Sequence, residues 1–389
     1  MGTYLNPDNS KFQESINSDI YVDKTGLITY TNSVIHTQQK CICVSRPRRF
    51  GKSMAANMLS AYYSRGCDSK ELFQNLEIAE DDQFETYLNQ YDVIFLNVQE
   101  FLSQSKNIDE MISLIRRSVL WDLLGEYPEF RYFDTSNLTR TMQDVYQQTK
   151  CPFVVIIDEW DCVFREYKTN RETQERYLDF LRDLLKDKGY IHLAYMTGIL
   201  PIAKYSSGSE LNMFLEYTMA SEEKFNEYFG FTESEVDILF EKYLKICETP
   251  TITREQLRLW YDGYATKAGE RMYNPRSVVT ALSNNNIGNY WTSSGPYDEI
   301  FYYIKNNVAD VKADLALMVS GEAVQAKVRE YAAASMNLST KNEIFSAMVV
   351  YGFLSYENGK VRIPNKELME CLEDQLETKQ HRCQVEEIK

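Results

Sequence analysis

The chain has 389 residues, enough for two or three domains, and its 44% hydrophobic and 25% charged residues are typical of a globular protein. The 57 acidic residues outnumber the 42 lysines and arginines, so the net charge of −15 argues against a surface that attracts nucleic acid or anionic membranes overall. The eight cysteines include no C-x-x-C pair and the three histidines are too few for a zinc-site pattern, which favours reduced thiols in a cytoplasmic protein.

The N-terminal segment is polar and lacks the basic and apolar regions of a signal peptide. Asn6 stands where a myristoylation motif requires serine or threonine. No apolar stretch approaches the roughly 18 residues that a membrane-spanning helix needs, so we expect a soluble, cytoplasmic protein with no membrane partner.

Four short apolar runs predict the strands of a parallel sheet. Residues 41–45 and 153–157 are apolar without alternation, as expected for central strands that are covered on both faces. Residues 93–98 and 192–197 are weaker examples of the same pattern. The sequence therefore predicts an α/β fold over roughly the first 220 residues.

Helical patterns lie between these runs, which is the order expected of a parallel sheet flanked by helices. One helix follows the capping box Asn107-x-x-Glu110 and ends at Gly125. Another is predicted to run from about Arg171 to Lys186.

After Gly230 the strand signals disappear, and two capped helices are predicted to begin after Thr232 and Thr253. Near the C-terminus, a helix around residues 343–350 precedes two strand-like runs joined by Asn358-Gly359, which is a strong hairpin signal. These shifts predict three domains: an α/β core at residues 1–228, a helical domain at 229–300 and a helical, winged-helix-like module at 301–389.

A phosphate-binding loop is predicted where Gly51-Lys52-Ser53 follows the run at 41–45 and precedes an amphipathic helix. Lys52 would reach the β- and γ-phosphates of ATP, and Ser53 would ligate Mg²⁺. Gly51 would let the phosphates approach the backbone, and we expect Lys52 to be exposed, so that its loss spares the fold. The predicted nucleotide-binding segment comprises Arg46, Pro47, Arg48, Arg49, Phe50, Gly51, Lys52, Ser53 and Met54.

This loop departs from the G-x-x-x-x-G-K-S pattern, because Arg46 stands in place of the first glycine. The alternative is a helix start that merely contains Gly-Lys-Ser. Arg46, Arg48 and Arg49 crowd the loop, and guanidinium groups suit phosphate oxygens, although each could instead pair with an acidic residue elsewhere. Among them, we expect Arg49 to contact the γ-phosphate and Arg46 to brace the loop.

The run at 153–157 ends in Asp158-Glu159, and this pair favours the phosphate loop over the alternative. Asp158 would hold the Mg²⁺ shell and Glu159 would polarise the attacking water, whereas an isolated Asp158 could simply cap a helix. Thr197 would hydrogen-bond the γ-phosphate or the water, unless it only ends a strand. For Asp161 we favour a turn or cap role.

Several segments are distinctive together: Tyr21-Val-Asp-Lys-Thr25, Ser45-Arg-Pro-Arg-Arg-Phe-Gly-Lys-Ser53, Ile156-Ile-Asp-Glu-Trp-Asp161, Thr197-Gly-Ile-Leu200, Phe229-Gly-Phe-Thr-Glu233, Trp260-Tyr-Asp-Gly-Tyr264 and Tyr273-Asn-Pro275. Through them the sequence resembles the bacterial AAA-ATPase-like proteins over most of its length. The resemblance implies a P-loop ATPase core with an additional strand, a helical lid, and ATP and Mg²⁺ as ligands.

The resemblance also implies that Arg46 is tolerated in a working site, because the replaced glycine is part of the family's pattern. By analogy with related ATPases, Tyr21, Asp23 and Thr25 would line the adenine pocket, although Asp23 could only be the N-cap of the next helix. Family members often carry a C-terminal nuclease domain of the PD-(D/E)XK type. The residues after Pro364 are too few to form one, so we expect that domain to be absent.

The leading hypothesis is an ATP-hydrolysing molecular switch in which nucleotide state sets the lid and a surface for an unidentified protein partner or a second copy of the chain. The alternatives are a non-hydrolysing nucleotide-binding scaffold and a nucleic-acid-associated or defence ATPase. Glu159 favours hydrolysis, and the net charge argues against gripping DNA unless the C-terminal module has a basic face. The cations noted around its last helix and hairpin are Lys341, Lys360, Arg362 and Lys366.

Overall fold

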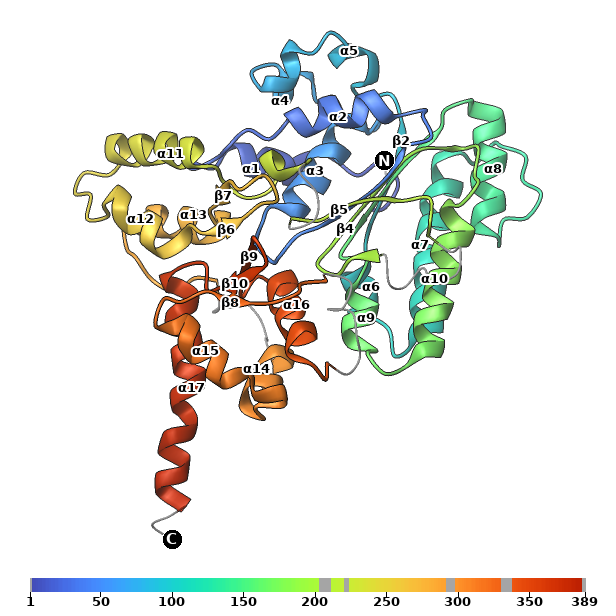
Figure 1. Ribbon diagram of the computed structural model, residues 1–389. Helices are drawn as coiled ribbons and strands as arrows, with labels where there is room; N and C mark the ends of the chain where they lie inside the picture. The colour runs from blue at the N-terminus through green and yellow to red at the C-terminus, as the bar shows by residue number, and fades with distance from the viewer. Residues whose placement is uncertain (1, 203–210, 220–223, 292–297, 330–337, 387–389) are drawn as a thin grey trace. The chain divides into compact units, whose positions relative to one another are not determined.

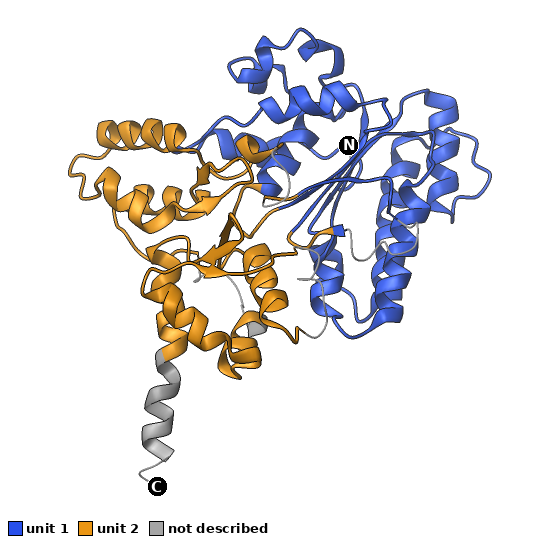
Figure 2. Ribbon diagram, in the orientation of Figure 1, with its two compact units in different colours: residues 1–45, 52–198, 202–217 blue, residues 46–51, 199–201, 218–389 orange. Residues whose placement is uncertain are grey.

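The computed structural model describes residues 2–202, 211–219, 224–291, 298–329 and 338–386. The chain forms two compact units that alternate along the sequence (Figure 2). Unit 1 comprises residues 1–45, 52–198 and 202–217, and unit 2 comprises residues 46–51, 199–201 and 218–389. Within the described ranges, every helix is too short or too polar to cross a membrane.

Unit 1 contains a five-stranded sheet in the order β2-β3-β4-β1-β5, and all its neighbouring strands are parallel (Figure 1). The strands are β1 Cys41–Ser45, β2 Asp92–Asn97, β3 Phe153–Asp158, β4 Ile191–Gly198 and β5 Leu215–Tyr217. Every residue of β1 and β3 is buried, which confirms the prediction from their unbroken apolar runs. Because β4 lies between β1 and β3, the sheet has the additional strand that the resemblance implies.

The path of the chain through the sheet decides which face each helix covers. From β1 the chain crosses to β2 at the edge and then returns through β3 to β4, so right-handed crossovers place the helices on opposite faces. The helix α3 (Lys52–Tyr63) packs against β2, β3 and β4. Across the sheet lie α7 (Ile108–Glu126), α8 (Leu138–Thr149) and α10 (Arg171–Leu185) (Figure 1).

Shorter helices complete unit 1: α1 Ser10–Ile16, α2 Gly26–Val34, α4 Lys70–Phe73, η1 Glu77–Glu80, α5 Phe84–Tyr87, α6 Val98–Ser103 and α9 Cys162–Glu166. The N-terminal segment extends the sheet beyond β2, because Leu5 forms an antiparallel bridge with Ile94. The backbone N–H of Asn6 also donates to the carbonyl of Val93 at 2.7 Å.

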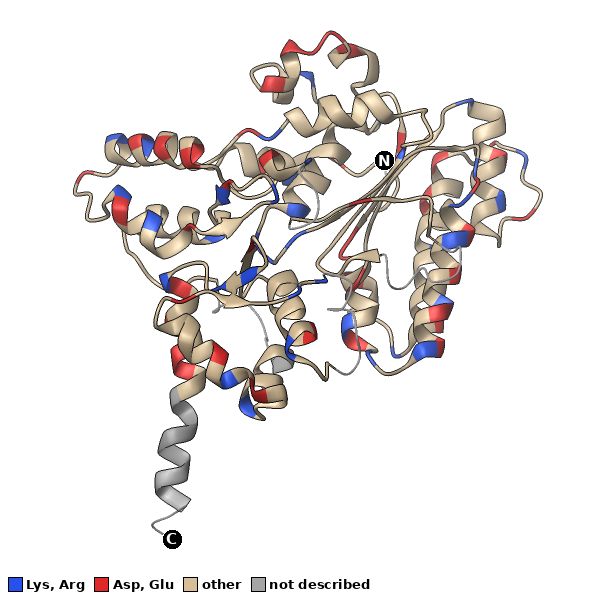
Figure 3. Ribbon diagram, viewed as in Figure 1, with Lys and Arg blue, Asp and Glu red and all other residues tan. Residues whose placement is uncertain are grey.

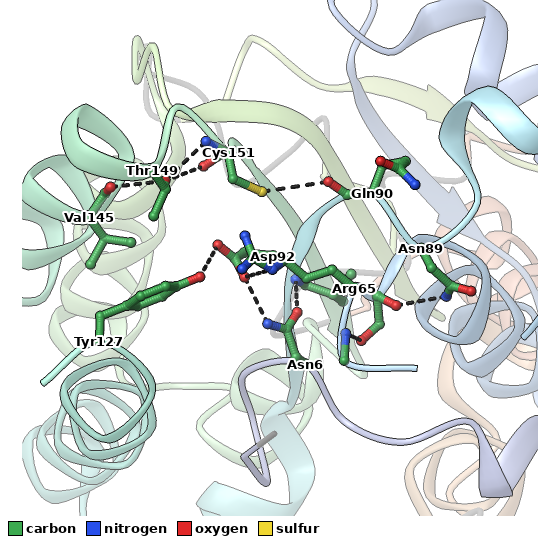
Figure 4. Close-up of polar contacts among 12 residues, drawn as sticks. Asn6, Arg65, Asn89, Gln90, Asp92, Tyr127, Val145, Thr149 and Cys151 are labelled. Carbon is green, nitrogen blue, oxygen red and sulfur yellow. Dashed lines mark hydrogen bonds and ion pairs between the residues drawn. The ribbon is translucent and has the colours of Figure 1, made fainter. Parts of the chain in front are cut away.

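At the start of β2, a buried carboxylate ties several segments of unit 1 together (Figure 4). Asp92 is fully buried, and its oxygens accept hydrogen bonds from Asn6 Nδ2 and from the Tyr127 hydroxyl, both at 2.7 Å. Arg65 Nε lies 3.6 Å from the same carboxylate. The network joins the N-terminal segment, the chain after α3 and the end of α7, so its polar groups serve the fold.

Replacing Asp92 with alanine should lower the free energy of unfolding by about 3–5 kcal/mol, because the buried Asn6 amide and Tyr127 hydroxyl lose their acceptor. The matched control is Asp109→Ala, which removes an exposed ion pair with Arg176 and should cost less than about 1 kcal/mol. Urea unfolding of both variants beside the parent measures the two losses. Equal losses would contradict the structural role of Asp92.

The longest stretch of unit 2, residues 218–389, contains first η3 (Asn226–Tyr228) and the helices α11 Glu233–Ile246, α12 Arg254–Tyr261 and α13 Pro275–Asn284. Thr232 and Thr253 form capping boxes with Glu235 and Gln256, which confirms the two predicted helix starts. No strand was predicted between Gly230 and the C-terminal hairpin, but β6 (Tyr264–Ala265) pairs antiparallel with β7 (Arg271–Met272) in that range. Strands of two residues are too short to show an alternating pattern.

The C-terminal part of unit 2 contains a three-stranded sheet in the order β8-β10-β9. Its elements are α14 Asp298–Lys305, η5 Val308–Asp310, α15 Val311–Val319, β8 Val324–Gln325, α16 Lys341–Tyr351, β9 Ser355–Glu357, β10 Lys360–Arg362 and α17 Lys366–Glu386. Asn358 and Gly359 have φ values of 51° and 79°, and they form the predicted hairpin turn between β9 and β10. The winged-helix interpretation and the boundary between lid and module stay predictions.

Candidate functional site

The loop at residues 46–51 follows β1 directly, and α3 begins at Lys52. Arg49 and Gly51 have φ values of 70° and 89°, in the left-handed region where glycine is favoured. A Cβ atom on Gly51 would have no described atom within 4 Å. Glycine is therefore needed here for its conformation, and the space beside it can admit a ligand close to the backbone.

Lys52 is only 5% exposed, so the expectation of an exposed loop lysine is wrong. It is the first residue of α3, and its side chain is buried rather than held out on the loop. Burial lowers the pKa of the Lys52 ammonium, and the nearby carboxylates of Glu159, Asp161 and Asp158 oppose that shift. The site thus contains a buried cation that faces acidic groups.

Asp158 ends β3, where it pairs in register with Asn97 of β2 and Thr197 of β4. Its carboxylate is buried and accepts hydrogen bonds from the Ser53 hydroxyl and from the backbone N–H of Glu159, the latter at 3.1 Å. Burial raises the pKa of Asp158 to about 6, although the Ser53 hydrogen bond acts in the opposite direction. The structure therefore brings together the two side chains that the sequence assigned to Mg²⁺.

Glu159 has a φ of 55°, and its carboxylate forms an ion pair with Arg165 of α9. Arg165 Nε also lies 3.1 Å from Oδ2 of Asp161, whose side chain is fully buried. Asp161 takes the N-cap position of α9 as expected, but its side chain makes no capping hydrogen bond and pairs with Arg165 instead. The sequence prediction missed Arg165, although its i,i+4 spacing from Asp161 is a known signal for such a pair.

Thr197 lies between β1 and β3, in register with Val44 on one side and Asp158 on the other. Its side chain is fully buried, and Oγ1 has no hydrogen-bond partner among the described residues. The next residue, Gly198, packs so closely on Asp161 that a Cβ would stand 2.6 Å from Oδ1. A buried hydroxyl without a partner is costly unless a ligand or water satisfies it.

The three loop arginines differ in exposure. Arg46 is 1% exposed, donates from Nη2 to Oδ1 of Asn226 at 3.2 Å, and its guanidinium stands 5.5 Å from the ring centre of Phe229. These contacts tie Arg46 to other parts of the chain, and its bracing role stays a prediction. Arg48 is half-buried and Arg49 is exposed, as is Met54 on α3.

Tyr21, Asp23 and Thr25 precede α2 in unit 1. Oδ1 of Asp23 accepts from the backbone N–H and the hydroxyl of Thr25, at 2.8 and 2.7 Å, and Oδ2 accepts from the N–H of Glu77 at 2.7 Å. Thr25, not Asp23, is the N-cap residue of α2. Asp23 therefore fixes the segment to η1, and the adenine-pocket role of the three residues stays a prediction.

Comparison with protein families identifies one match. The family described as Predicted AAA-ATPase, or AAA-ATPase-like, matches residues 9–207, just over half of the chain. A curated relative, an uncharacterised protein encoded in the vnfD 5′ region of Azotobacter chroococcum mcd 1, is 24% identical over 284 residues. That alignment covers 71% of this chain and 50% of the relative, so the chain spans about half of the relative's length.

Solved structures with a similar arrangement are distant in sequence. The Walker-type ATPase of Pyrococcus abyssi is 10% identical with a TM-score of 0.47, over 90% of this chain and 94% of that one. The ORC2 protein of Aeropyrum pernix, solved with ADPNP and ADP, is 12% identical with a TM-score of 0.39, over 92% and 94%. At these scores the fold assignment rests on the strand order and the family match.

Proposed function

This chain belongs to the AAA-ATPase-like family, and we propose that it binds ATP with Mg²⁺ and hydrolyses it as a cytoplasmic molecular switch. One observation supports this most: α3 and β3 bring Lys52, Ser53 and Asp158 together at the carboxyl edge of the sheet. Ligands of open α/β sheets bind at that edge.

The triphosphate would lie against the backbone N–H groups of the loop and the N-terminus of α3, where unpaired donors and the helix dipole favour anions. Lys52 would then bind the β- and γ-phosphates and interact less strongly with the site carboxylates. Tyr21, Asp23 and Thr25 are proposed to border the adenine.

Mg²⁺ would be held by the Ser53 hydroxyl and the Asp158 carboxylate, which already contact each other. This donor set fits the ion, because Mg²⁺ in ATPase sites uses one or two protein oxygens, with waters and phosphate oxygens completing the octahedron.

For hydrolysis, Glu159 would accept a hydrogen bond from the attacking water, while Arg165 holds one of its carboxylate oxygens. The unpaired hydroxyl of Thr197 would contact the γ-phosphate or that water. These roles favour an active ATPase over a non-hydrolysing scaffold.

A nucleic-acid-binding function has less support. Figure 3 shows acidic and basic residues interspersed in the C-terminal part of unit 2. Three of the four cations noted there pair with acids: Lys341 with Asp314 at 2.8 Å, Arg362 with Glu357 at 2.8 Å and Lys366 with Glu370 at 3.6 Å. Paired cations offer little net attraction to a phosphate backbone.

Phosphate release from ATP by the purified protein tests the proposed function, with Mg²⁺ or with EDTA, and then with DNA or RNA added. We expect turnover that requires Mg²⁺ and is unchanged by nucleic acid. Stimulation by nucleic acid would favour the nucleic-acid-associated alternative, and absence of turnover in a protein that binds ATP would favour the scaffold.

The loop arginines should divide by their effect on ATP relative to ADP. Arg49→Ala should weaken ATP about tenfold more than ADP, because a guanidinium at the γ-phosphate has more to bind in ATP. Arg46→Ala should weaken both alike, since its side chain contacts Asn226 and Phe229. Calorimetry gives both affinities, with Arg48→Ala measured in parallel and the exposed Arg171→Ala as the control. If every variant keeps the parental ratio, no loop arginine contacts the γ-phosphate.

A further inference from the structure

The loop at residues 46–51 belongs to unit 2 by its contacts, although it begins and ends in unit 1 by chain connection. Besides the Arg46 contacts, the ring of Phe50 packs edge-on against Tyr264 with 5.0 Å between centres. Pro47 lies so close to Gly352 that a Cβ on that glycine would stand 2.8 Å from Cβ of Pro47. Other segments of unit 2 therefore contact the loop along most of the loop's length.

Two carbonyl groups of the loop accept hydrogen bonds from other segments of unit 2. The indole Nε1 of Trp291 donates to the carbonyl of Arg48 at 3.4 Å, and the backbone N–H of Gly230 donates to the carbonyl of Phe50 at 3.3 Å. A loop that turns its N–H groups toward a phosphate must direct its carbonyls elsewhere, and those carbonyls need donors of their own. Trp291 and Gly230 are such donors.

The buried carboxylate of Glu367 fixes the backbone at Trp291. Oε1 of Glu367 accepts from the backbone N–H groups of Tyr290 and Trp291 at 2.7 and 2.8 Å, and from the Ser277 hydroxyl at 3.0 Å. The Glu367 side chain is fully buried, and so is the Trp291 ring, which packs edge-on against Phe353. The position of the indole N–H is therefore set by Glu367.

We propose that Trp291 and Glu367 are positioning residues for nucleotide binding, which hold the Arg48 carbonyl so that the loop presents its N–H groups in one conformation. This inference rests on the proposed ATP site and assigns Trp291 and Glu367 a part in shaping the loop at residues 46–51. Because binding and loop order are linked in both directions, nucleotide bound to the loop should in turn stabilise the 290–291 backbone.

The first test is Trp291→Phe, which keeps an aromatic ring against Phe353 but removes the indole N–H. Affinity for ATP and for ADP should each fall about fivefold, the effect of one lost hydrogen bond. In turnover, KM for ATP should rise while kcat stays parental, because the lost interaction serves ground state and transition state alike.

Two further variants separate positioning from general stability. Glu367→Ala should also weaken both nucleotides, and Glu367→Gln should restore binding because its amide oxygen can still accept from residues 290 and 291. Tyr261→Phe is the matched control. It removes the hydrogen bonds between the Tyr261 hydroxyl and the backbone of Gly288, in the segment that precedes Trp291, and neither of these bonds involves the loop. It should keep parental affinity.

Parental affinity in a folded Trp291→Phe, or an equal loss in Tyr261→Phe, would overturn the inference. If the variants do not fold, hydrogen exchange of the parent chain decides: ATP should slow exchange at residues 290 and 291, and unchanged exchange would overturn the inference equally. A parent that binds no ATP at all would instead refute the proposed function on which the inference rests.

Discussion

Replacing Lys52 with alanine should reduce the affinity for ATP at least about a hundredfold, which is the scale of losing charge-assisted hydrogen bonds to two phosphates. Burial lowers the pKa of Lys52 in the site, and the carboxylates of Glu159, Asp161 and Asp158 act in the opposite direction. Without Lys52, the same carboxylates would face the negatively charged triphosphate with less compensation.

Calorimetry with ATP and Mg²⁺ measures the effect. The control is Lys70→Ala, which removes an exposed lysine paired with Glu85 in the same unit and should bind ATP as the parent does. Circular dichroism must accompany the titration, because Lys52 is enclosed and its loss removes buried contacts as well as charge. Unchanged affinity in a folded Lys52→Ala would remove the phosphate-loop assignment.

Glu159→Gln should bind ATP at least as tightly as the parent and hydrolyse it about 10²–10³-fold more slowly, since a neutral amide cannot serve as the base that polarises water. The change keeps the size of the side chain but replaces its ion pair with Arg165 by a neutral hydrogen bond. In this variant, therefore, the affinity for ATP should be kept while the rate of hydrolysis falls.

Single-turnover phosphate release and ATP titration on the same preparation check that separation. Glu172→Gln, at the exposed start of α10, provides a control with the same chemical change outside the site. Parental hydrolysis by Glu159→Gln would place the base elsewhere, with Asp161 next to be tested. Because Asp161 is fully buried and paired with Arg165, we expect Asp161→Asn to act through the position of Arg165.

The local elements of unit 1 could be predicted from the sequence because each one has its own signal. Unbroken apolar runs gave β1 and β3, and the capped helix at Asn107 ends within one residue of the prediction. The contact between Ser53 and Asp158 followed from two separate motifs whose strands end at the same edge of one sheet.

Contacts between distant segments could not be predicted in this way. Arg46 meets Asn226 across 180 positions, and Trp291 meets the carbonyl of Arg48 across 243, and no periodic pattern records such pairs. The predicted exposure of Lys52 was wrong for a related reason: a lysine at a loop–helix junction looks exposed until the carboxylates at and after the end of β3 are brought beside it. Tertiary packing determines both the long-range contacts and the burial of Lys52.

Titration of the parent chain with ATP in the presence of Mg²⁺ tests the central claim most directly. We predict one saturable site per chain, with tighter binding in Mg²⁺ than in EDTA and a higher melting temperature when ATP is bound, since a ligand of the folded state stabilises it. A folded protein that shows neither binding heat nor a change in melting temperature at millimolar ATP would contradict the account.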